Sequence, residues 1–372
     1  MNSPVTKRLR VLVVDDSAIV RRLVAQALSL QPDMEVTGCA ESGLAALERV
    51  ASDRPDAVVL DLDMPVMNGL EALRELKKRY GDLPVLVLSA HTSEGSQGAI
   101  DALLAGADDY ATKPANLAPG STQWLAVHTE LALKLRSITR RARRIELART
   151  VPIISERPPV SGNSSLVRTR VRAVAIGTSS GGPEALAVLL PRFSAALKVP
   201  LLIVQHMPRS FTAALAARLH AKSALRVTEA EHGQVVEPGV AFLAPGDRHM
   251  QVSNRMGRIS LLLDEGPLEN GCRPSVDPLF RSAAETYGAG LLAVVLTGIG
   301  SDGLEGARRV AANGGHIWVQ DRESSAVWGM PGAISRAGLA RRTCTLNSMA
   351  SAIEAAIADG LPAHYPSEAG AC

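Results

Sequence analysis

The chain has 372 residues, more than one ordinary domain holds, so we expect two domains. A formal net charge of +3 argues against a wholly basic nucleic-acid binder, and an aromatic content of 3% is too low for a surface on which bases stack. The apolar stretches are too short for a signal peptide or a membrane span. The four cysteines are scattered without a C-x-x-C pair, which is typical of a reducing compartment. We therefore expect a soluble, cytoplasmic protein without membrane insertion.

The first part of the chain repeats a short apolar run, a polar turn and a helical pattern. Strands are predicted at five apolar runs: Val11–Val14, Met34–Cys39, Ala57–Leu60, Val85–Leu88 and, more weakly, Asp108–Thr112. Helical periodicity separates these runs, as in "AIVRRLVAQALSL" and "LEALRELKKRY". Strands that alternate with helices indicate a parallel sheet covered on both faces, here an open doubly wound domain.

Charged side chains follow the strands of this predicted sheet. Carboxyl ends of parallel strands meet at one edge, where the chain places one hydroxyl, one lysine and a set of carboxylates: Asp15, Asp16, Asp61, Asp63, Ser89 and Lys113. Clustered carboxylates favour a bound cation, and their hard oxygens suit Mg²⁺. A cation beside a lysine also neutralises a phosphoryl group. Capping of the helix near Ser17 would explain Asp15 alone, not the set.

Four motifs in this part carry a resemblance to a known family. "VLVVDDSAIVRRL", "VVLDLDMPVMNGLEAL", "VLVLSAHT" and "YATKPA" resemble the response-regulator receiver domain over its full length, a flavodoxin-like parallel sheet. The resemblance implies that Asp61 is the phospho-acceptor and that Mg²⁺ is held by Asp16, Asp61 and the backbone of Asp63, with Asp15 assisting.

The same resemblance assigns roles to three further side chains. Ser89 and Lys113 would contact the phosphoryl group, and Tyr110 would be the aromatic side chain that moves on activation. Asn68 stands where many relatives carry an aspartate, and we expect little consequence because it lies in a predicted loop. A sensor histidine kinase is the implied partner.

A helical pattern over about residues 123–144 ends in the basic stretch "KLRSITRRARRIELART", and the Pro/Ser/Gly-rich "VPIISERPPVSGNSS" follows it. The basic stretch could bind acidic partners or nucleic acid, although such runs are more often a solvated helix face. We interpret residues 123–170 as a basic helix and flexible linker between a first domain, 1–122, and a second, 171–362.

The second domain restarts the alternation. Strands are predicted at Val171–Ile176, Leu201–Val204, Leu291–Leu296, Val240–Leu243, Ile259–Leu263 and Ile317–Val319. Helices are predicted at Pro183–Leu190, Thr212–His220, Val276–Thr286 and Gly303–Ala312. This pattern indicates a second α/β domain with a mostly parallel sheet and an antiparallel excursion around residues 240–263.

The loop "AIGTSSGGPEA" could bind a phosphate, bind a dinucleotide or present a nucleophile. It contains G-x-S-x-G around Ser179, a strand-to-helix turn that can expose a serine, and it lacks both G-x-G-x-x-G and the P-loop lysine. His206 and Asp302 also follow apolar strands, so the three residues could form a nucleophile, base and acid. His206 could instead be a buried structural histidine, and Asp302 could cap the helix near Gly303. The backbone around Ile299 could supply oxyanion donors.

Six further motifs resemble the catalytic domain of the chemotaxis protein-glutamate methylesterase (CheB) family: "AIGTSSGGPEAL", "IVQHMPRSFTAALAARL", "LAPGDRHM", "CRPSVDPLF", "VVLTGIGSDGLEGA" and "VQDRESSAVWGMP". The resemblance implies Ser179 as nucleophile, His206 as base and Asp302 as orienting acid. It places Ile299, Arg273 and Ser180 at the oxyanion or substrate positions. Cys272 replaces a histidine common in relatives, which leaves the polar role of that position in doubt.

The implied reaction is hydrolysis of γ-glutamyl methyl esters on the cytoplasmic domains of methyl-accepting chemoreceptors, with deamidation of glutamines as a second activity. The receiver domain is expected to inhibit until Asp61 is phosphorylated, and the esterase domain to need no cofactor. The alternative is a phosphorylation-controlled scaffold with an inactive triad. A DNA-binding regulator would need a helix-turn-helix output, and an oxidoreductase would need the missing dinucleotide motif.

Overall fold

A computed structural model describes residues 8–90, 92–113, 129–139 and 168–362 of the chain. The chain divides into two compact units, Met1–Arg149 and Thr150–Cys372. The predicted linker lies largely outside the described residues. No helix in the described part is long and apolar enough to cross a membrane.

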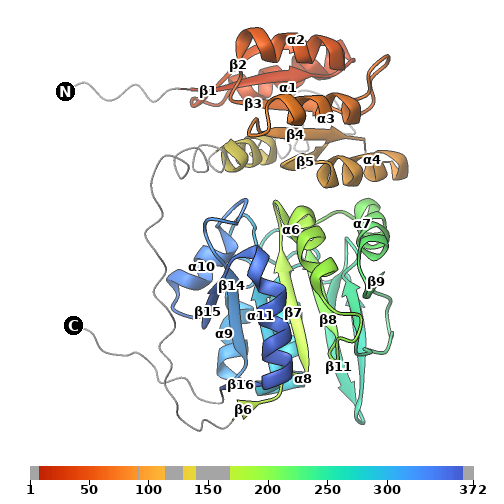
Figure 1. The fold of residues 1–372 in the computed structure, drawn as a ribbon, viewed down its shortest axis with the longest axis vertical. Coiled ribbons are helices and arrows are strands. Elements are labelled where there is room, and N and C mark those ends of the chain that lie inside the picture. Colours follow the sequence, from red (N-terminus) through yellow and green to blue (C-terminus); the bar gives the residue numbers. More distant parts are fainter. Residues whose placement is uncertain (1–7, 91, 114–128, 140–167, 363–372) are drawn as a thin grey trace, which may run out of the picture. The chain divides into compact units, whose positions relative to one another are not determined.

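The first unit is built around a five-stranded parallel sheet with the strand order β2-β1-β3-β4-β5 (Figure 1). The strands are β1 (Leu9–Val14), β2 (Met34–Ala40), β3 (Ala57–Asp61), β4 (Val85–Ser89) and β5 (Asp109–Thr112). The helices between them are α1 (Ala18–Ser29), α2 (Gly43–Asp53), α3 (Gly69–Arg79) and α4 (Ser93–Leu104). The predicted strands and their parallel arrangement are confirmed, and the strand order is that of flavodoxin-like folds.

The sheet forms because its central strands are apolar on both faces and helices cover both faces. Val13 and Val59 are fully buried on one face of the sheet, and Leu12 is fully buried on the other. The helices begin at polar caps, and Asn68 is the cap of α3. Its side-chain oxygen accepts from the N–H of Glu71 at 2.9 Å, and the Glu71 carboxylate accepts from the N–H of Asn68 at 3.1 Å. An aspartate would supply the same side-chain oxygen, so little consequence of the asparagine remains the expectation, although the residue caps a helix.

A helical segment at residues 129–139, within the range predicted as a basic helix and flexible linker, packs on the same sheet. Leu131, Leu135 and Ile138 lie in the buried core with residues of β1, β3 and β4. Arg136 forms a two-pronged ion pair with Asp33, with nitrogen–oxygen distances of 2.8 and 2.7 Å. The apolar spacing of i, i+4 and i+7 draws this segment onto the first unit, despite the basic residues around it.

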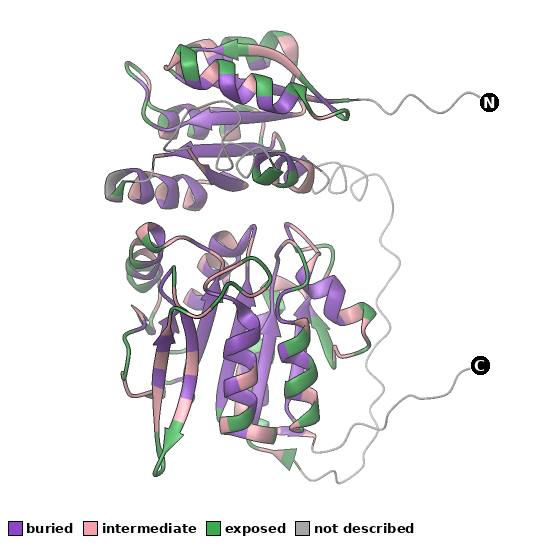
Figure 2. Ribbon diagram, turned by 180° about the vertical axis from the view of Figure 1, so that it is seen from behind, coloured by how far each residue is buried: buried purple, intermediate pink, exposed green. Residues whose placement is uncertain are grey.

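The second unit contains a seven-stranded parallel sheet with the order β15-β14-β13-β7-β8-β10-β9. Its central strands are almost completely buried (Figure 2). The strands are β7 (Ala173–Thr178), β8 (Leu201–Gln205), β9 (Arg226–Glu229), β10 (Val240–Leu243), β13 (Leu291–Val295), β14 (His316–Gln320) and β15 (Arg342–Cys344). The helices are α6 (Gly182–Leu189), α7 (Arg209–Lys222), α8 (Val276–Tyr287), α9 (Leu304–Ala312), α10 (Met330–Arg336) and α11 (Leu346–Asp359).

The antiparallel excursion is smaller than predicted. It is the hairpin of β11 (His249–Arg255) and β12 (Arg258–Asp264), a separate two-stranded sheet. Strand β10 belongs instead to the main parallel sheet, between β8 and β9. Its short apolar run gives no sign of direction, because a fully buried strand lacks the alternation that marks a half-exposed hairpin. A further short pair joins β6 (Arg168–Thr169) to β16 (Leu361–Pro362).

Candidate functional site

The first polar site lies at the carboxyl edge of the first sheet. Asp15 follows β1, Asp61 ends β3 and Lys113 follows β5. The Lys113 ammonium lies 2.9 Å from an oxygen of Asp15 and 2.7 Å from one of Asp61. Both carboxylates are fully buried, while the lysine side chain is partly exposed. The structure thus brings together two predicted acids and the predicted lysine, each from a different strand.

Burial dominates the electrostatics of this cluster. It raises the pKa of Asp15, and the hydrogen bond from Lys113 offsets this only in part. Burial lowers the pKa of Lys113, but hydrogen bonds to Asp61 and Asp15 outweigh it and raise the pKa overall. One lysine therefore balances two buried carboxylates.

The cluster suits a small hard cation. Carboxylate oxygens of Asp15, Asp16 and Asp61 lie within 4.8 Å of one another. The second oxygen of Asp61 is buried and has no hydrogen-bond partner in the described residues. Asp63 is exposed, and its N–H points back to Asp61 at 3.3 Å. An unpaired buried oxygen beside two further carboxylates is the donor set that Mg²⁺ prefers.

Ser89 and Tyr110 also lie in this unit, where they bond to groups other than Asp61 and Lys113. The hydroxyl of Ser89 donates to the carbonyl of Gly95 at 2.5 Å. Tyr110 is buried, and Lys134 places its ammonium 4.5 Å from the centre of the tyrosine ring. The same ammonium donates to the Tyr110 carbonyl at 2.7 Å. Lys134, which sequence analysis missed, lies on the helical segment at residues 129–139.

The second polar site lies at the carboxyl edge of the second sheet, where β7 turns into α6. The N–H of Ser179 donates to the Thr297 carbonyl at 3.0 Å, and the Ser179 carbonyl accepts from Gln205 Nε2 at 2.9 Å. A side chain at Gly298 would come within 2.9 Å of the Ser179 Cβ, so this glycine is needed for the close approach. Ser179 is half-buried, whereas Ser180 is buried, so only the former is open to a substrate.

His206 and Asp302 meet directly although 96 positions apart. His206 follows β8, and Asp302 lies in the turn between β13 and α9. Their hydrogen bond joins His206 Nε2 to an Asp302 oxygen at 2.6 Å. The other ring nitrogen, Nδ1, lies 3.5 Å from the sulfur of Cys272. The structure thus places two predicted residues, His206 and Asp302, beside one another, with Ser179 at the same sheet edge.

Comparison with known proteins identifies the family. Residues 174–353 match the CheB methylesterase family, and residues 11–119 match the response regulator receiver domain family. A protein-glutamate methylesterase/protein-glutamine glutaminase from Nocardioides sp. is 42% identical over 370 residues, covering 97% of this chain and 99% of that protein. The chain belongs to the CheB methylesterase family. Fold class and enzyme class predicted from the sequence are thereby confirmed.

Two further CheB-family proteins are similar over long stretches of sequence. A protein of the same name from Trichodesmium erythraeum is 40% identical over 346 residues, with 93% of this chain and 98% of that protein covered. The solved CheB methylesterase catalytic domain of Thermotoga maritima is 37% identical and matches with a TM-score of 0.49, covering 50% of this chain and 98% of that domain.

In this CheB-family chain, the Asp302 carboxylate is held by donors on every side. One oxygen accepts from Asn270 Nδ2, the Ser275 hydroxyl and the backbone N–H groups of Asp277 and Gly303, at 2.8–3.2 Å. The other accepts from the N–H of Val276 at 2.7 Å besides His206. Burial raises the pKa of Asp302, but the bond from His206, its charge and these donors outweigh burial and lower it to about 2.

Asn270 also ties Asp302 to a second buried acid. Its side-chain nitrogen donates to Asp277 at 2.8 Å as well as to Asp302 at 2.9 Å. Burial raises the pKa of Asp277, and the negative charge of Asp302 raises it further. Asn270 has φ +54° and Gly271 has φ +74°, and Glu269 and Cys272 exchange both backbone hydrogen bonds. Such an Asn-Gly pair is the signature of a tight hairpin turn, and it is the sequence signal for this residue that the sequence analysis did not use.

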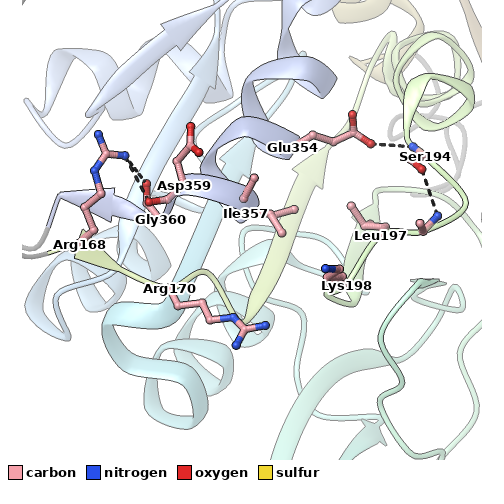
Figure 3. Close-up of a pocket in the computed structure, with 11 residues that line it drawn as sticks. Arg168, Arg170, Ser194, Leu197, Lys198, Glu354, Ile357, Asp359 and Gly360 are labelled. Atoms are coloured by element: carbon pink, nitrogen blue, oxygen red, sulfur yellow. Dashed lines mark hydrogen bonds between the residues drawn. The ribbon is translucent and has the colours of Figure 1, made fainter.

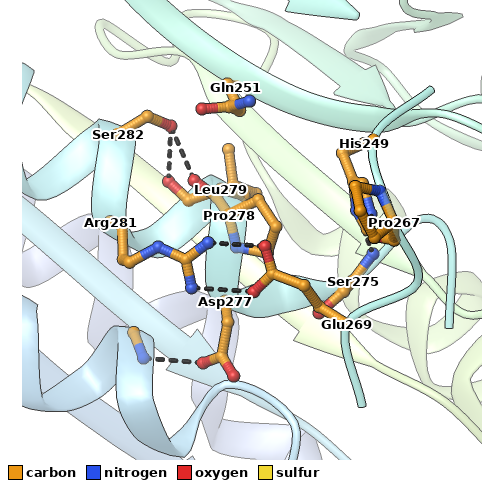
Figure 4. Close-up of polar contacts among 12 residues, drawn as sticks. His249, Gln251, Pro267, Glu269, Ser275, Asp277, Pro278, Leu279, Arg281 and Ser282 are labelled. Atoms are coloured by element: carbon orange, nitrogen blue, oxygen red, sulfur yellow. Dashed lines mark hydrogen bonds and ion pairs between the residues drawn. The ribbon is translucent and has the colours of Figure 1, made fainter. Parts of the chain in front are cut away.

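This turn is anchored from outside by three contacts (Figure 4). Arg281 forms a two-pronged ion pair with Glu269, at 2.9 and 2.7 Å. His249 bonds the Pro267 carbonyl at 2.9 Å. Arg273, which we expect to line the substrate cleft, directs one nitrogen to the Glu265 and Gly266 carbonyls, at 2.8 and 2.7 Å. At least part of the Arg273 guanidinium therefore holds the loop.

Two backbone amides are available near Ser179. Within the described residues, the N–H groups of Ser180 and Ile299 donate no hydrogen bond. Ser180 directly follows the candidate nucleophile, and Ile299 follows Gly298 on the neighbouring turn. Free N–H groups beside a nucleophile are what an oxyanion requires.

A cavity of about 510 Å³ lies at the opposite edge of the second sheet, near the amino ends of β7 and β8 (Figure 3). Basic Arg170 and Lys198 share it with acidic Glu354 and Asp359. Arg168 donates to the carbonyls of Asp359 and Gly360 at 3.4 and 3.2 Å. None of the predicted site residues lines this cavity.

Proposed function

We propose that the chain hydrolyses γ-glutamyl methyl esters, and deamidates glutamines, on the cytoplasmic helical domains of chemoreceptors, through Ser179, His206 and Asp302. The observation that carries the proposal is the 2.6 Å bond between His206 and Asp302 at the sheet edge that also presents Ser179. The name shared by the relatives, protein-glutamate methylesterase/protein-glutamine glutaminase, supports the substrate class.

In the proposed mechanism the Ser179 hydroxyl attacks the ester carbonyl while His206 accepts its proton at Nδ1. Asp302 keeps the proton of Nε2 and stabilises the imidazolium that forms. The N–H groups of Ser180 and Ile299 would stabilise the oxyanion. The protonated His206 then gives its proton to the departing methoxide, which leaves as methanol, and water, activated by the same nitrogen, hydrolyses the acyl-enzyme and releases glutamate. A glutamine amide presents the same carbonyl and would release ammonia.

The free enzyme has no hydrogen bond between the Ser179 hydroxyl and His206 within the described residues. Nucleophile–base bonds are often formed only when substrate is bound, so substrate binding would complete the array. The proposed mechanism therefore does not require a serine–histidine hydrogen bond in the free enzyme.

We further propose that Asp61 accepts a phosphoryl group from a sensor histidine kinase and that this relieves inhibition by the receiver domain. Asp15, Asp16, Asp61 and the backbone of Asp63 would hold Mg²⁺, whose charge would neutralise phosphoryl oxygens. Lys113, already 2.7 Å from Asp61, would pair with the phosphoryl group, and Ser89 would turn from Gly95 to meet it. The added charge of about −1.5 to −2 supplies the driving force for this rearrangement.

Methanol release from methylated chemoreceptor fragments tests the esterase proposal. Ser179→Ala should lower kcat about 10⁴-fold or more, and the adjacent Ser180→Ala should lower it much less. Both variants should keep the wild-type Tm within a few degrees. An active Ser179→Ala variant would overturn the assignment of the nucleophile, and no methanol release by the wild type would favour an inactive scaffold.

Control by phosphorylation is tested by comparing the full chain with and without a small phosphodonor. We expect stimulation in the wild type and none in Asp61→Asn, whose basal activity should match the unphosphorylated wild type. Equal rates with and without phosphodonor would contradict inhibition by the receiver domain.

A further inference from the structure

Cys272 contacts Nδ1 of His206, the ring nitrogen that accepts the serine proton in the proposed mechanism. Its sulfur lies 3.5 Å from His206 Nδ1, while Nε2 is held by Asp302 at 2.6 Å. Both ring nitrogens are therefore engaged in the free enzyme. The sulfur is a weak hydrogen-bond acceptor, so it suits the protonated imidazole, whose Nε2–H points to Asp302 and whose Nδ1–H points to Cys272.

The position of this thiol is built into the loop. The N–H of Cys272 donates to the Glu269 carbonyl at 2.9 Å, and its carbonyl accepts from the N–H of Glu269 at 3.1 Å. Glu269 is in turn fixed by Arg281, as Figure 4 shows. The backbone of Cys272 is therefore held on both sides of the turn, which keeps the thiol within reach of His206.

Resting on the proposed serine mechanism, we propose that Cys272 is a restraining residue that competes with Ser179 for Nδ1 of His206. In the free enzyme the protonated Nδ1–H donates to the sulfur. Before Ser179 can pass its proton to this nitrogen, Nδ1 has to release its own proton to solvent and the thiol has to rotate away. No covalent bond forms at the sulfur in this scheme.

The groups around His206 determine in which direction the loss of the thiol should shift the pKa of His206. Asp302 and Cys272 face the ring, and Asp277 and Arg281 lie behind Asp302. Burial lowers the pKa of His206, but the bonds to Asp302 and Cys272 outweigh it and raise the pKa to about 9. A base with that pKa is neutral in only about one molecule in a hundred at pH 7. Removing the thiol should lower the pKa of His206, and a pKa lower by about one should make the neutral fraction at pH 7 about tenfold larger.

The experiment measures kcat/KM for ester hydrolysis from pH 6 to 10 with the full chain. We compare the wild type with Cys272→Ala and Cys272→Ser, and with Cys39→Ala as a control that removes an exposed thiol from the first unit. The pKa of His206 is followed independently by NMR of ¹³C-labelled histidine, which needs no substrate. Tm values confirm that each variant is folded.

We expect the Cys272→Ala profile to move to lower pH, with kcat/KM at pH 7 raised by up to about tenfold if the pKa of His206 falls by about one. Cys272→Ser keeps an acceptor for Nδ1–H and should stay near the wild type, as should Cys39→Ala. An unchanged midpoint in Cys272→Ala, or equal displacements in Cys272→Ala and Cys272→Ser, would overturn the restraint. Loss of activity in Cys272→Ala together with an active Ser179→Ala would instead overturn the serine mechanism itself.

Discussion

The two polar sites balance buried carboxylates in different ways. In the first unit, Asp15 and Asp61 share one lysine ammonium, and one Asp61 oxygen has no hydrogen-bond partner in the described residues. In the second unit, Asp302 is bonded by backbone N–H groups, a hydroxyl, an amide and an imidazole. A lysine can exchange partners as a ligand arrives, whereas backbone donors cannot move without moving their helix. The first arrangement suits a site that changes charge, and the second suits a fixed orienting group.

Asp302→Asn should break the fixed arrangement with the largest effect. Activity should fall about 10⁴-fold, since the amide no longer holds the right His206 tautomer. The amide nitrogen also faces donors it cannot accept from, which should lower the unfolding free energy by about 1–3 kcal/mol. Ester hydrolysis and thermal unfolding measure the two effects, with Asp359→Asn on the surface as the control. A variant that keeps near wild-type activity would contradict the role of Asp302.

Asn270→Ala should produce a smaller loss through the same carboxylate. Without the amide, Asp277 and Asp302 face each other with no shared donor, so the pKa of Asp302 should rise and its hold on His206 weaken. We expect kcat to fall about 10- to 100-fold, an effect of about 1.4 to 2.7 kcal/mol, with KM changed little.

Asn270→Asp serves as the matched control for Asn270→Ala. It keeps the size and turn preference but replaces the donor by a third acid, so it should be at least as damaging as alanine. An Asn270→Asp variant as active as the wild type would show that the turn matters and the donor does not.

Mg²⁺ should stabilise the lysine-balanced site measurably. A hundredfold excess over the Kd should add about 2.7 kcal/mol to the stability of the first unit, seen as a higher Tm in thermal scans. Asp61→Asn should remove most of this increase in Tm. Asp63→Asn should keep it, since the proposed ligand there is the backbone. Equal loss in both variants, or no increase in the wild type, would argue against this metal geometry.

Lys134→Met should give the smallest effect. It keeps the aliphatic stem but removes an ammonium that lies over the Tyr110 ring and 3.8 Å from Asp109. We expect a loss of about 1 kcal/mol in urea unfolding of the first unit. Lys78→Met on the exposed face of α3 should change stability by less than about 0.5 kcal/mol. Equal losses in the two variants would mean that Lys134 has no special part in holding Tyr110.

Strands and strand ends were predictable from the sequence, and this explains why so many site residues were. Asp15, Asp61, Ser179, His206 and Asp302 each follow a clear apolar run, and topology then brings strand ends together. Residues of the Asn270-Gly271 turn were not predicted as a positioning group, because a loop between a hairpin and a helix carries no periodicity. The bond from Asn270 to Asp302 spans 32 positions and depends on packing alone.

Contacts outside the strand pattern were missed for related reasons. Lys134 reaches Tyr110 only because the helical segment at residues 129–139 folds back on the sheet, and its basic neighbours had favoured a solvated linker helix. Ser275 was not singled out by the sequence analysis, yet its hydroxyl donates to Asp302 at 2.8 Å.

Asp302 receives hydrogen bonds from the first residues of α8 and from the residue that precedes α9. One side chain therefore fastens two helices as well as orienting a base. A descendant of this chain that lost its esterase activity would still be under selection to keep the aspartate, because losing it would loosen both helices. The three residues of the triad therefore differ in what they indicate about the activity of a new sequence. An aspartate at the position of Asp302 indicates mainly that the fold is kept, whereas a serine at the position of Ser179 indicates that the chemistry is kept.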